Sequence, residues 1–226
     1  MPSVQPIHAD FTRQVVVDTA TMDWQASPSP KVWRKRLFHR GAIETGCVTS
    51  IVRYDPDSHF PSHTHPDGEE ILVLDGVFED EHGVYPKGTY LLNPDGSRHA
   101  PASPEGCTLF VKLRQYPGAD RPRIVLDTAC GRWESGGNPD IEYLALYAHK
   151  TGSERMQLER WQPGASAPLH THDDLVELFV IEGTMADEHG VYEQGNWIRF
   201  PKGSSHAPHS ELGCLVYAKV GPPPVA

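Results

Sequence analysis

The stretch that decides the fold is HTHPDGEEILVLDGVFEDEHGVYPKGTYLLNPDGSRHAP, residues 63–101. It recurs 107 positions later as HTHDDLVELFVIEGTMADEHGVYEQGNWIRFPKGSSHAP, residues 170–208. Twenty of the 39 aligned positions are identical, and the alignment needs no gap. Self-similarity at a fixed offset is the mark of a repeated structural unit, so the chain is predicted to be two copies of one module.

Composition limits the classes of function. The 226 residues suffice for two domains of about 110 residues each. The formal net charge of −10 disfavours nucleic acid as a partner, because binding to phosphates normally requires a basic excess. No apolar run reaches the roughly 18 residues that a membrane span needs. The opening residues, MPSVQPIHADF, lack the basic and apolar regions of a secretory signal, which predicts a cytoplasmic location.

The organisation follows from the repeat. We expect an N-terminal arm over residues 1–30, a first module over 31–118 and a second module over 119–226. The segment VVVDTA at 15–20 resembles IVLDTA at 124–129. Each module is therefore expected to begin with an edge strand, which could also pair with the other module.

Short apolar runs bounded by turn residues fill both modules. Examples are VTSIVRY and EEILVLDG in the first copy and RMQLERW and VELFVIEG in the second. Several runs alternate between apolar and polar residues, and none sustains a helical period beyond two turns. This pattern predicts an all-β fold in which each module is a sandwich or barrel built from hairpins.

The first copy contains a set of metal-ligand residue types. His63 and His65 are two positions apart, so on a strand their imidazoles face the same side. Glu69 has the parity to face the same point, and His99 arrives about thirty residues later from another strand. Three imidazoles and a carboxylate suit zinc, iron, manganese, nickel or copper rather than calcium or magnesium. We predict a divalent transition-metal site at His63, His65, Glu69 and His99.

The second copy has three histidines in register with the first: His170, His172 and His206. Val176 stands where Glu69 stands, and the acid here is Glu177, the equivalent of Glu70. A shift of one residue turns a strand side chain to the other face unless a bulge intervenes. Two alternatives stay open. Either Glu177 is a ligand, which would make Glu70 the ligand in the first copy, or the second copy has lost its carboxylate. Asp173 and Asp174 are further acids that could substitute.

These motifs resemble those of the cupin superfamily. Its first motif fits His63, His65, Glu69 and Gly76, and its second motif fits Pro94, Gly96 and His99. The second copy fits at His170, His172, Gly183, Pro201, Gly203 and His206, and departs from the motif at Val176. The likeness is closest to the ChrR-like cupin family and extends over roughly three quarters of the chain. It implies two tandem cupin jelly-roll barrels, each a double-stranded β-helix.

The resemblance also implies functions. Similar family members are zinc-binding cupin domains of anti-sigma factors or oxygenase-like metal cupins, so zinc is the first expectation for the metal. Residues 1–60 lack the Cys-x-x-Cys and the helical pattern of a sigma-binding domain. We therefore expect a metal-dependent small-molecule sensor that acts through a regulatory protein partner. The alternative is an Fe(II)-type dioxygenase acting on a small diketone or phenolic substrate. A homodimer is a further expectation.

Overall fold

A computed structural model describes residues 5–42, 44–118, 120–150 and 152–224. The predicted all-β architecture is confirmed, because the described elements are β-strands apart from one short 3-10 turn, η1 (Thr19–Thr21). No helix within these ranges has the length and apolar character needed to cross a membrane. The chain divides into two compact units, Met22–Cys130 and Gly131–Pro223, and Asp10–Thr21 belongs to the second.

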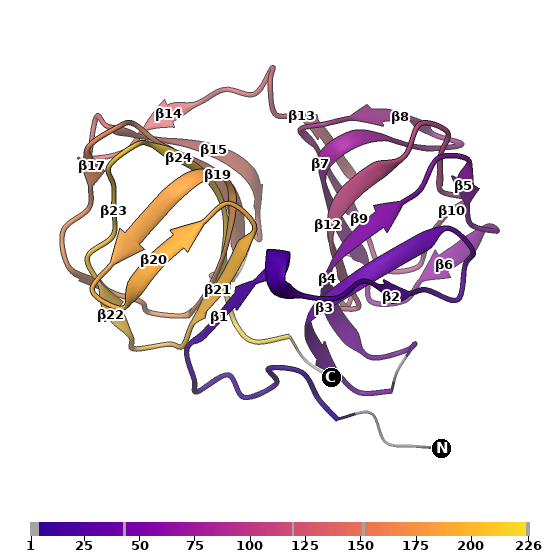
Figure 1. Cartoon of the computed structure of the whole chain (residues 1–226), viewed down its shortest axis with the longest axis horizontal. Coiled ribbons are helices and arrows are strands. Elements are labelled where there is room, and N and C mark those ends of the chain that lie inside the picture. The colour runs from indigo at the N-terminus through magenta and orange to yellow at the C-terminus, as the bar shows by residue number, and fades with distance from the viewer. Residues whose placement is uncertain (1–4, 43, 119, 151, 225–226) are drawn as a thin grey trace. The chain divides into compact units, whose positions relative to one another are not determined.

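The first unit is built around a sheet with the strand order β13-β9-β7-β12-β4-β3-β2. A small second sheet pairs β10 with β6, and β5, β8 and β11 complete the barrel. In Figure 1 the strands of this unit curl around an interior. Its strands are β2 (Gln25–Ala26), β3 (Val32–Arg40), β4 (Cys47–Tyr54), β5 (Ser58–His59), β6 (His63–His65), β7 (Glu69–Asp80), β8 (Gly83–Pro86), β9 (Thr89–Asn93), β10 (Ser97–His99), β11 (Ala102–Ser103), β12 (Cys107–Leu113) and β13 (Ile124–Asp127).

The second unit repeats this plan with the order β1-β21-β19-β24-β16-β15-β14 and a small β18-β22 sheet. Strand β19 takes the place of β7, and β16 takes that of β4. The strands are β1 (Val15–Asp18), β14 (Glu134–Ser135), β15 (Ile141–Ala148), β16 (Arg155–Trp161), β17 (Ala165–Ser166), β18 (His170–Thr171), β19 (Leu175–Asp187), β20 (Gly190–Glu193), β21 (Asn196–Phe200), β22 (Ser205–His206), β23 (His209–Ser210) and β24 (Cys214–Gly221).

The two edge strands expected from the sequence both exist, and each completes a sheet of the other repeat. Strand β1 pairs antiparallel with β21, and β13 pairs antiparallel with β9. The sequence boundaries of 1–30, 31–118 and 119–226 therefore differ from the compact units, because backbone pairing carries 10–21 into the second unit and 120–130 into the first.

Side chains alternate between the two faces of each strand, so every second residue points into the barrel interior. In the first unit the interior cluster includes Ile71, Val73, Leu91, Leu109 and Val111. The residues 107 positions later form the corresponding cluster of the second unit: Leu178, Val180, Ile198, Val216 and Ala218. The repeat seen in the sequence is thus a repeat of core positions.

Strand β7 changes partner at Gly76, where it leaves β12 and continues beside β8. A Cβ at Gly76 would lie 2.2 Å from the carbonyl oxygen of Gly106, and the φ angle there is +73°. Only glycine fits such a close approach in the left-handed region. Gly183 has the same environment in β19. The bend directs the far end of each long strand, where Asp80 and Asp187 lie, towards the small sheet.

Candidate metal centres

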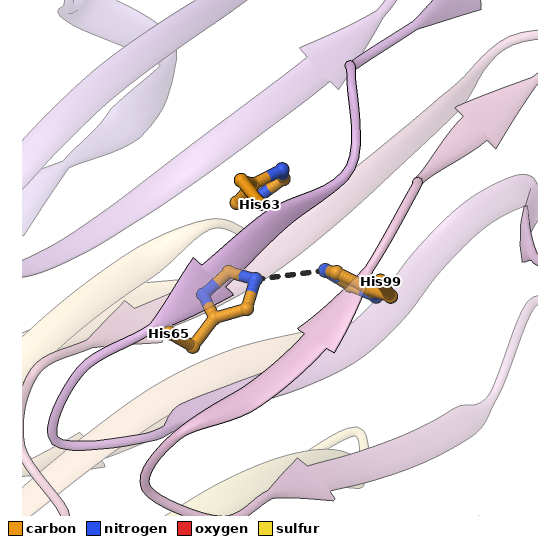
Figure 2. A group of neighbouring side chains, drawn as sticks. All are labelled: His63, His65 and His99. Atoms are coloured by element: carbon orange, nitrogen blue, oxygen red, sulfur yellow. Dashed lines mark hydrogen bonds between the residues drawn. The ribbon is translucent and has the colours of Figure 1, made fainter.

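Three histidines converge from two neighbouring strands in the first unit. Strands β6 and β10 run antiparallel with His63 opposite His99, and His65 lies two residues farther along β6. Figure 2 shows the three side chains beside one another, with a dashed line between the rings of His65 and His99. One ring nitrogen from each histidine lies within 4.8 Å of the other two, and the Nε2 atoms of His65 and His99 are 2.8 Å apart. The three could hold a metal ion.

Glu69 lies beside these histidines at the start of β7. Its Oε2 atom is 3.6 Å from Nε2 of His65 and 3.4 Å from Nε2 of His99. The same oxygen accepts a hydrogen bond of 3.0 Å from the side-chain amide of Asn93. Burial raises the pKa of Glu69, and the nearby His99 ring and the Asn93 bond oppose that rise. A cation at this point would therefore offset the cost of keeping the carboxylate ionised.

Glu70 points to the other face of β7. Its carboxylate accepts a hydrogen bond from the Tyr116 hydroxyl, and Lys112 is its partner in register on β12. Because neighbouring residues of a strand face opposite ways, only Glu69 shares the side of His65 and His99.

One backbone carbonyl and one side-chain carboxylate fix the orientations of the His63 and His99 rings. The Nδ1 atom of His63 is 2.9 Å from the carbonyl oxygen of Pro61. The Nδ1 atom of His99 is 3.1 Å from Oδ2 of Asp80. A carbonyl and an ionised carboxylate only accept, so each Nδ1 carries the proton and each Nε2 keeps a lone pair.

Asp80 is a residue that sequence reasoning missed. Its side chain is 1% exposed, and its other oxygen accepts from the backbone N–H of His82 at 2.8 Å and the hydroxyl of Tyr85 at 2.9 Å. Burial works against ionisation of Asp80, but these hydrogen bonds and the one from His99 outweigh it and lower its pKa. Carboxylates placed behind ligating histidines in this way set ring orientation in metal sites. The signal in the sequence was the hexapeptide DEHGVY, which is identical in both copies.

The next residue of that hexapeptide, Glu81, also supports the third histidine. The Glu81 carboxylate accepts from the backbone N–H of Ala100 at 2.8 Å, which ties the hairpin tip to the residue after His99. His82, in contrast, lies exposed at the turn. The hexapeptide therefore holds the third histidine, and its own histidine is not part of the group.

The protonation state of the group fits a metal ion. Burial, followed by the neighbouring His63 and Arg114, lowers the pKa of His65 to about 3, so this ring is neutral at pH 7. The Nε2 atoms of His65 and His99 are hydrogen-bonded to each other beside the Glu69 carboxylate. An ion bound here would replace the shared proton and leave imidazole nitrogens and carboxylate oxygens as acceptors. A divalent transition ion satisfies such a set of acceptors.

A cavity of about 230 Å³ adjoins this group. His63, His65, Glu69 and His99 line it on one side. The rest of the wall is mostly apolar and includes Val48, Val52, Ile71, Phe78, Leu109 and Val111. A small organic molecule in the cavity would therefore lie against the metal-binding group.

The second unit repeats the histidine arrangement. His170, His172 and His206 each offer a ring nitrogen within 4.8 Å of the other two. The Nδ1 atom of His170 is 3.0 Å from the Pro168 carbonyl oxygen, and Nδ1 of His206 is 2.9 Å from Oδ2 of Asp187. The Nε2 atom of His172 is buried without a hydrogen-bond partner. Burial, then the rings of His206 and His170, lower the pKa of His172 to about 4. An unpartnered lone pair at this point fits a metal ion.

Glu177, one of the two alternatives for the acid of the second copy, does not lie with these histidines. Its carboxylate accepts a hydrogen bond of 2.7 Å from the indole N–H of Trp197. Val176 is the residue that faces the barrel interior, where it belongs to the apolar cluster. The physical reason is strand parity, since β19 has no bulge at this point that would exchange the two faces. Of the two open alternatives, the structure supports loss of the carboxylate from this position.

Comparisons with known proteins agree with this geometry. A family described as the ChrR cupin-like domain matches residues 12–117 and again residues 121–224. No curated protein sequence matches the chain. Among solved structures, a provisionally assigned dioxygenase from Nostoc punctiforme PCC 73102 has a TM-score of 0.77 at 17% identity, covering 93% of this chain and 83% of that one.

Two further solved structures bear on the fold. A pirin from Escherichia coli in complex with nickel(II) has a TM-score of 0.66 at 13% identity, covering 93% of this chain and 100% of that one. An oxalate decarboxylase variant from Bacillus subtilis has a TM-score of 0.65 at 12% identity, covering 96% of this chain and 79% of that one. At these identities the likeness extends to the fold alone.

Proposed function

The chain belongs to the ChrR cupin-like family, and from that premise we propose that its first module is a transition-metal centre that binds a small, largely apolar organic molecule. One observation carries the proposal: the metal-ligand atoms and the apolar wall share one cavity of about 230 Å³. A metal enclosed on all sides by protein ligands is structural, whereas one that adjoins a cavity can accept a further ligand.

His63, His65, His99 and Glu69 would hold the ion. Bound there, a divalent transition metal would supply a Lewis acid with positions free for a ligand. Asp80 keeps the His99 ring in the tautomer that leaves Nε2 available, and Asn93 holds the Glu69 carboxylate by its Oε2 atom. These residues prepare the site before the ion arrives, which favours tight binding.

Zinc is our first proposal for the metal, with iron, manganese or nickel as alternatives. Imidazole and carboxylate ligands suit all four, so geometry and availability decide among them. Elemental analysis of protein purified without added metal tests the proposal directly. We expect at least one tightly held transition ion per chain, and protein free of such metals would contradict it.

The output of ligand binding separates two candidate functions. We propose a sensor that binds a small molecule and signals through a regulatory protein partner. The second candidate is a dioxygenase acting on a small diketone or phenol, which the apolar wall beside three histidines and a glutamate favours. Oxygen consumption by the Fe(II)-loaded protein with small diketones and phenols distinguishes them. Turnover supports the dioxygenase, and saturable binding without turnover supports the sensor.

We do not expect this chain alone to bind a sigma factor tightly. Within the described part of residues 1–60 the elements are strands and one 3-10 turn, with no α-helix. We expect a pull-down from lysate of the source cell to recover no sigma factor in stoichiometric amount, and recovery of one would refute this expectation. A cytoplasmic location and a homodimer also stay predictions.

A further inference from the structure

The cavity of the second module differs in chemistry from that of the first. It measures about 420 Å³, and His170, His172 and His206 line it. Strand β16 contributes three polar residues to its wall: Arg155, Gln157 and Glu159. The residues 107 positions earlier, on β4, are Val48, Ser50 and Val52, which line the first cavity. The two modules therefore share a fold and differ in this wall.

One pair of positions exchanges its residue types between the copies. In the first module Glu69 is on β7 and Val52 is on β4, and both line the cavity. In the second module Val176 takes the place of Glu69, and Glu159 takes the place of Val52. Each cavity thus keeps one carboxylate at these two positions, but on different strands.

Glu159 is held in place by neutral donors. Its Oε1 atom accepts a hydrogen bond of 2.7 Å from the Gln157 side-chain amide, and its Oε2 atom accepts one of 3.2 Å from the Trp161 indole N–H. Both donors lie on β16 and on the same face as Glu159. They fix the carboxylate in the cavity without neutralising its charge.

Within the described residues, Glu159 forms no ion pair, although it is mostly buried. Burial raises the pKa of Glu159, and the Gln157 and Trp161 hydrogen bonds oppose that rise, followed by the weaker influence of Arg155 and His170. A buried carboxylate without a cationic partner is costly, so a cation in the cavity would stabilise it.

Beside the histidines of this cavity no carboxylate takes the position that Glu69 has in the first module, although Asp187 contacts His206 from behind. Nε2 of His172 is buried and has no hydrogen-bond partner, and Val176 supplies no charge. A divalent ion held by three neutral imidazoles keeps its full positive charge, which a nearby anion would stabilise. Glu159 lines the same cavity and needs a cation. A metal ion on the histidines would supply the cation that Glu159 needs, and Glu159 would supply the anion that the metal ion needs.

We propose that the second module is a metal centre of its own, in which Glu159 on β16 supplies the negative charge that Glu69 on β7 supplies in the first module. This inference extends the proposed function, which concerns the first module, and its test reports on the two centres separately. Asp173 and Asp174 also border the cavity. Asp173 is exposed, and Asp174 accepts a hydrogen bond from the Ser153 hydroxyl. They provide matched control substitutions.

The test uses the full chain and Co(II) alone as the probe. A His63→Ala/His99→Ala background removes the first centre, so calorimetry and visible absorption report only the second. In that background we expect Glu159→Gln to weaken Co(II) binding by about ten- to a hundredfold, the usual effect of losing a supporting carboxylate. Asp173→Asn should change the affinity by no more than about twofold, because an exposed charge is screened. Asp174→Asn should do the same, because the Ser153 hydroxyl already donates to its carboxylate.

A second variant tests whether a carboxylate on the other strand can replace Glu159. Glu159→Val/Val176→Glu moves the carboxylate to the strand used by the first module, and we expect it to bind Co(II) within about tenfold of the background protein, since charge balance is restored. Circular dichroism and thermal unfolding establish that each variant is folded.

Two outcomes would overturn the inference. One is unchanged Co(II) affinity in folded Glu159→Gln while His172→Ala abolishes binding. The other is a background protein that binds no Co(II) at all. The converse background, His206→Ala, leaves only the first centre. Loss of binding there would contradict the proposed function of the first module instead, so the two failures are distinguishable.

Discussion

Substitution of Asp80 by asparagine tests whether the residues behind the histidines control metal binding. The Asp80 side chain is 1% exposed and accepts three hydrogen bonds, from Nδ1 of His99, the Tyr85 hydroxyl and the His82 backbone N–H. An asparagine of the same size keeps one acceptor oxygen and gains an N–H₂ group, which cannot accept the proton of His99 Nδ1. The retained oxygen is needed by the His82 backbone N–H, which can only donate, so the N–H₂ group faces His99. The Nδ1 proton of His99 is then left without an acceptor, or it moves to Nε2.

The second possibility removes the lone pair that faces the metal. In His99 the Nε2 atom lies 3.4 Å from Glu69 Oε2 and 2.8 Å from His65 Nε2, so a proton there would occupy the space of the ion. Loss of such a supporting carboxylate typically costs 10- to 100-fold in metal affinity. We therefore expect Asp80→Asn to weaken binding at the first centre by about 1.4–2.8 kcal/mol.

The assay is competition for Zn(II) with a chromophoric chelator in a His206→Ala background, where only the first centre binds. Asp187→Asn is the matched control, because the same substitution in the second module should leave the first centre unchanged. If folded Asp80→Asn retains the parent affinity within about twofold, the proposed orientation by Asp80 is refuted.

Three further predictions concern the first centre. His99→Ala should abolish its metal, and elemental analysis showing an unchanged metal content would contradict the ligand assignment. Glu69→Gln should weaken metal binding, whereas Glu70→Gln should lower thermal stability and leave metal affinity unchanged, which chelator competition and calorimetry can measure. The third concerns the metal-free protein, in which His65 has a pKa of about 3 against 6.5 for an ordinary histidine. Between these values the unfolded chain binds a proton that the folded chain does not, so stability is unaffected above pH 6.5 and is lost as the pH falls from 6.5 towards 3. The loss at pH 5 should be ~2 kcal/mol, and urea unfolding of His65→Gln should show a smaller pH dependence.

The fold could be predicted from the sequence because the repeat indicated two modules and the short, alternating apolar runs in both copies indicated β-strands. The short apolar run EEILVLDG predicts a strand, and the structure has it within β7, with Ile71 and Val73 in the core cluster. The same parity argument separated Glu69 from Glu70, whose carboxylates point to opposite faces of β7. The same parity argument turns Glu177 away from the barrel interior, where its carboxylate accepts a hydrogen bond from Trp197 instead of facing the histidines.

Other features depended on contacts that no local pattern encodes. The pairing of β1 with β21 joins residues some 180 positions apart. Asp80 was missed because its significance comes from a hydrogen bond to His99, nineteen positions away in the sequence. Glu159 looked like an ordinary polar residue of an alternating strand, and only its place in the cavity beside the histidines gives it chemical interest.

The two modules share the carboxylate that holds the third histidine, and they differ in one wall of the cavity. Asp80 and Asp187 contact His99 and His206 in the same way, and both belong to the identical hexapeptide at the end of a bent strand. The varied wall lies on β4 and β16, which contribute no histidine to either group. A change on that wall therefore alters what the cavity binds without disturbing the imidazoles. Strand β4 presents two valines and a serine to its cavity, whereas β16 presents an arginine, a glutamine and a glutamate. The two modules should therefore select different small molecules while holding metal through the same histidine framework.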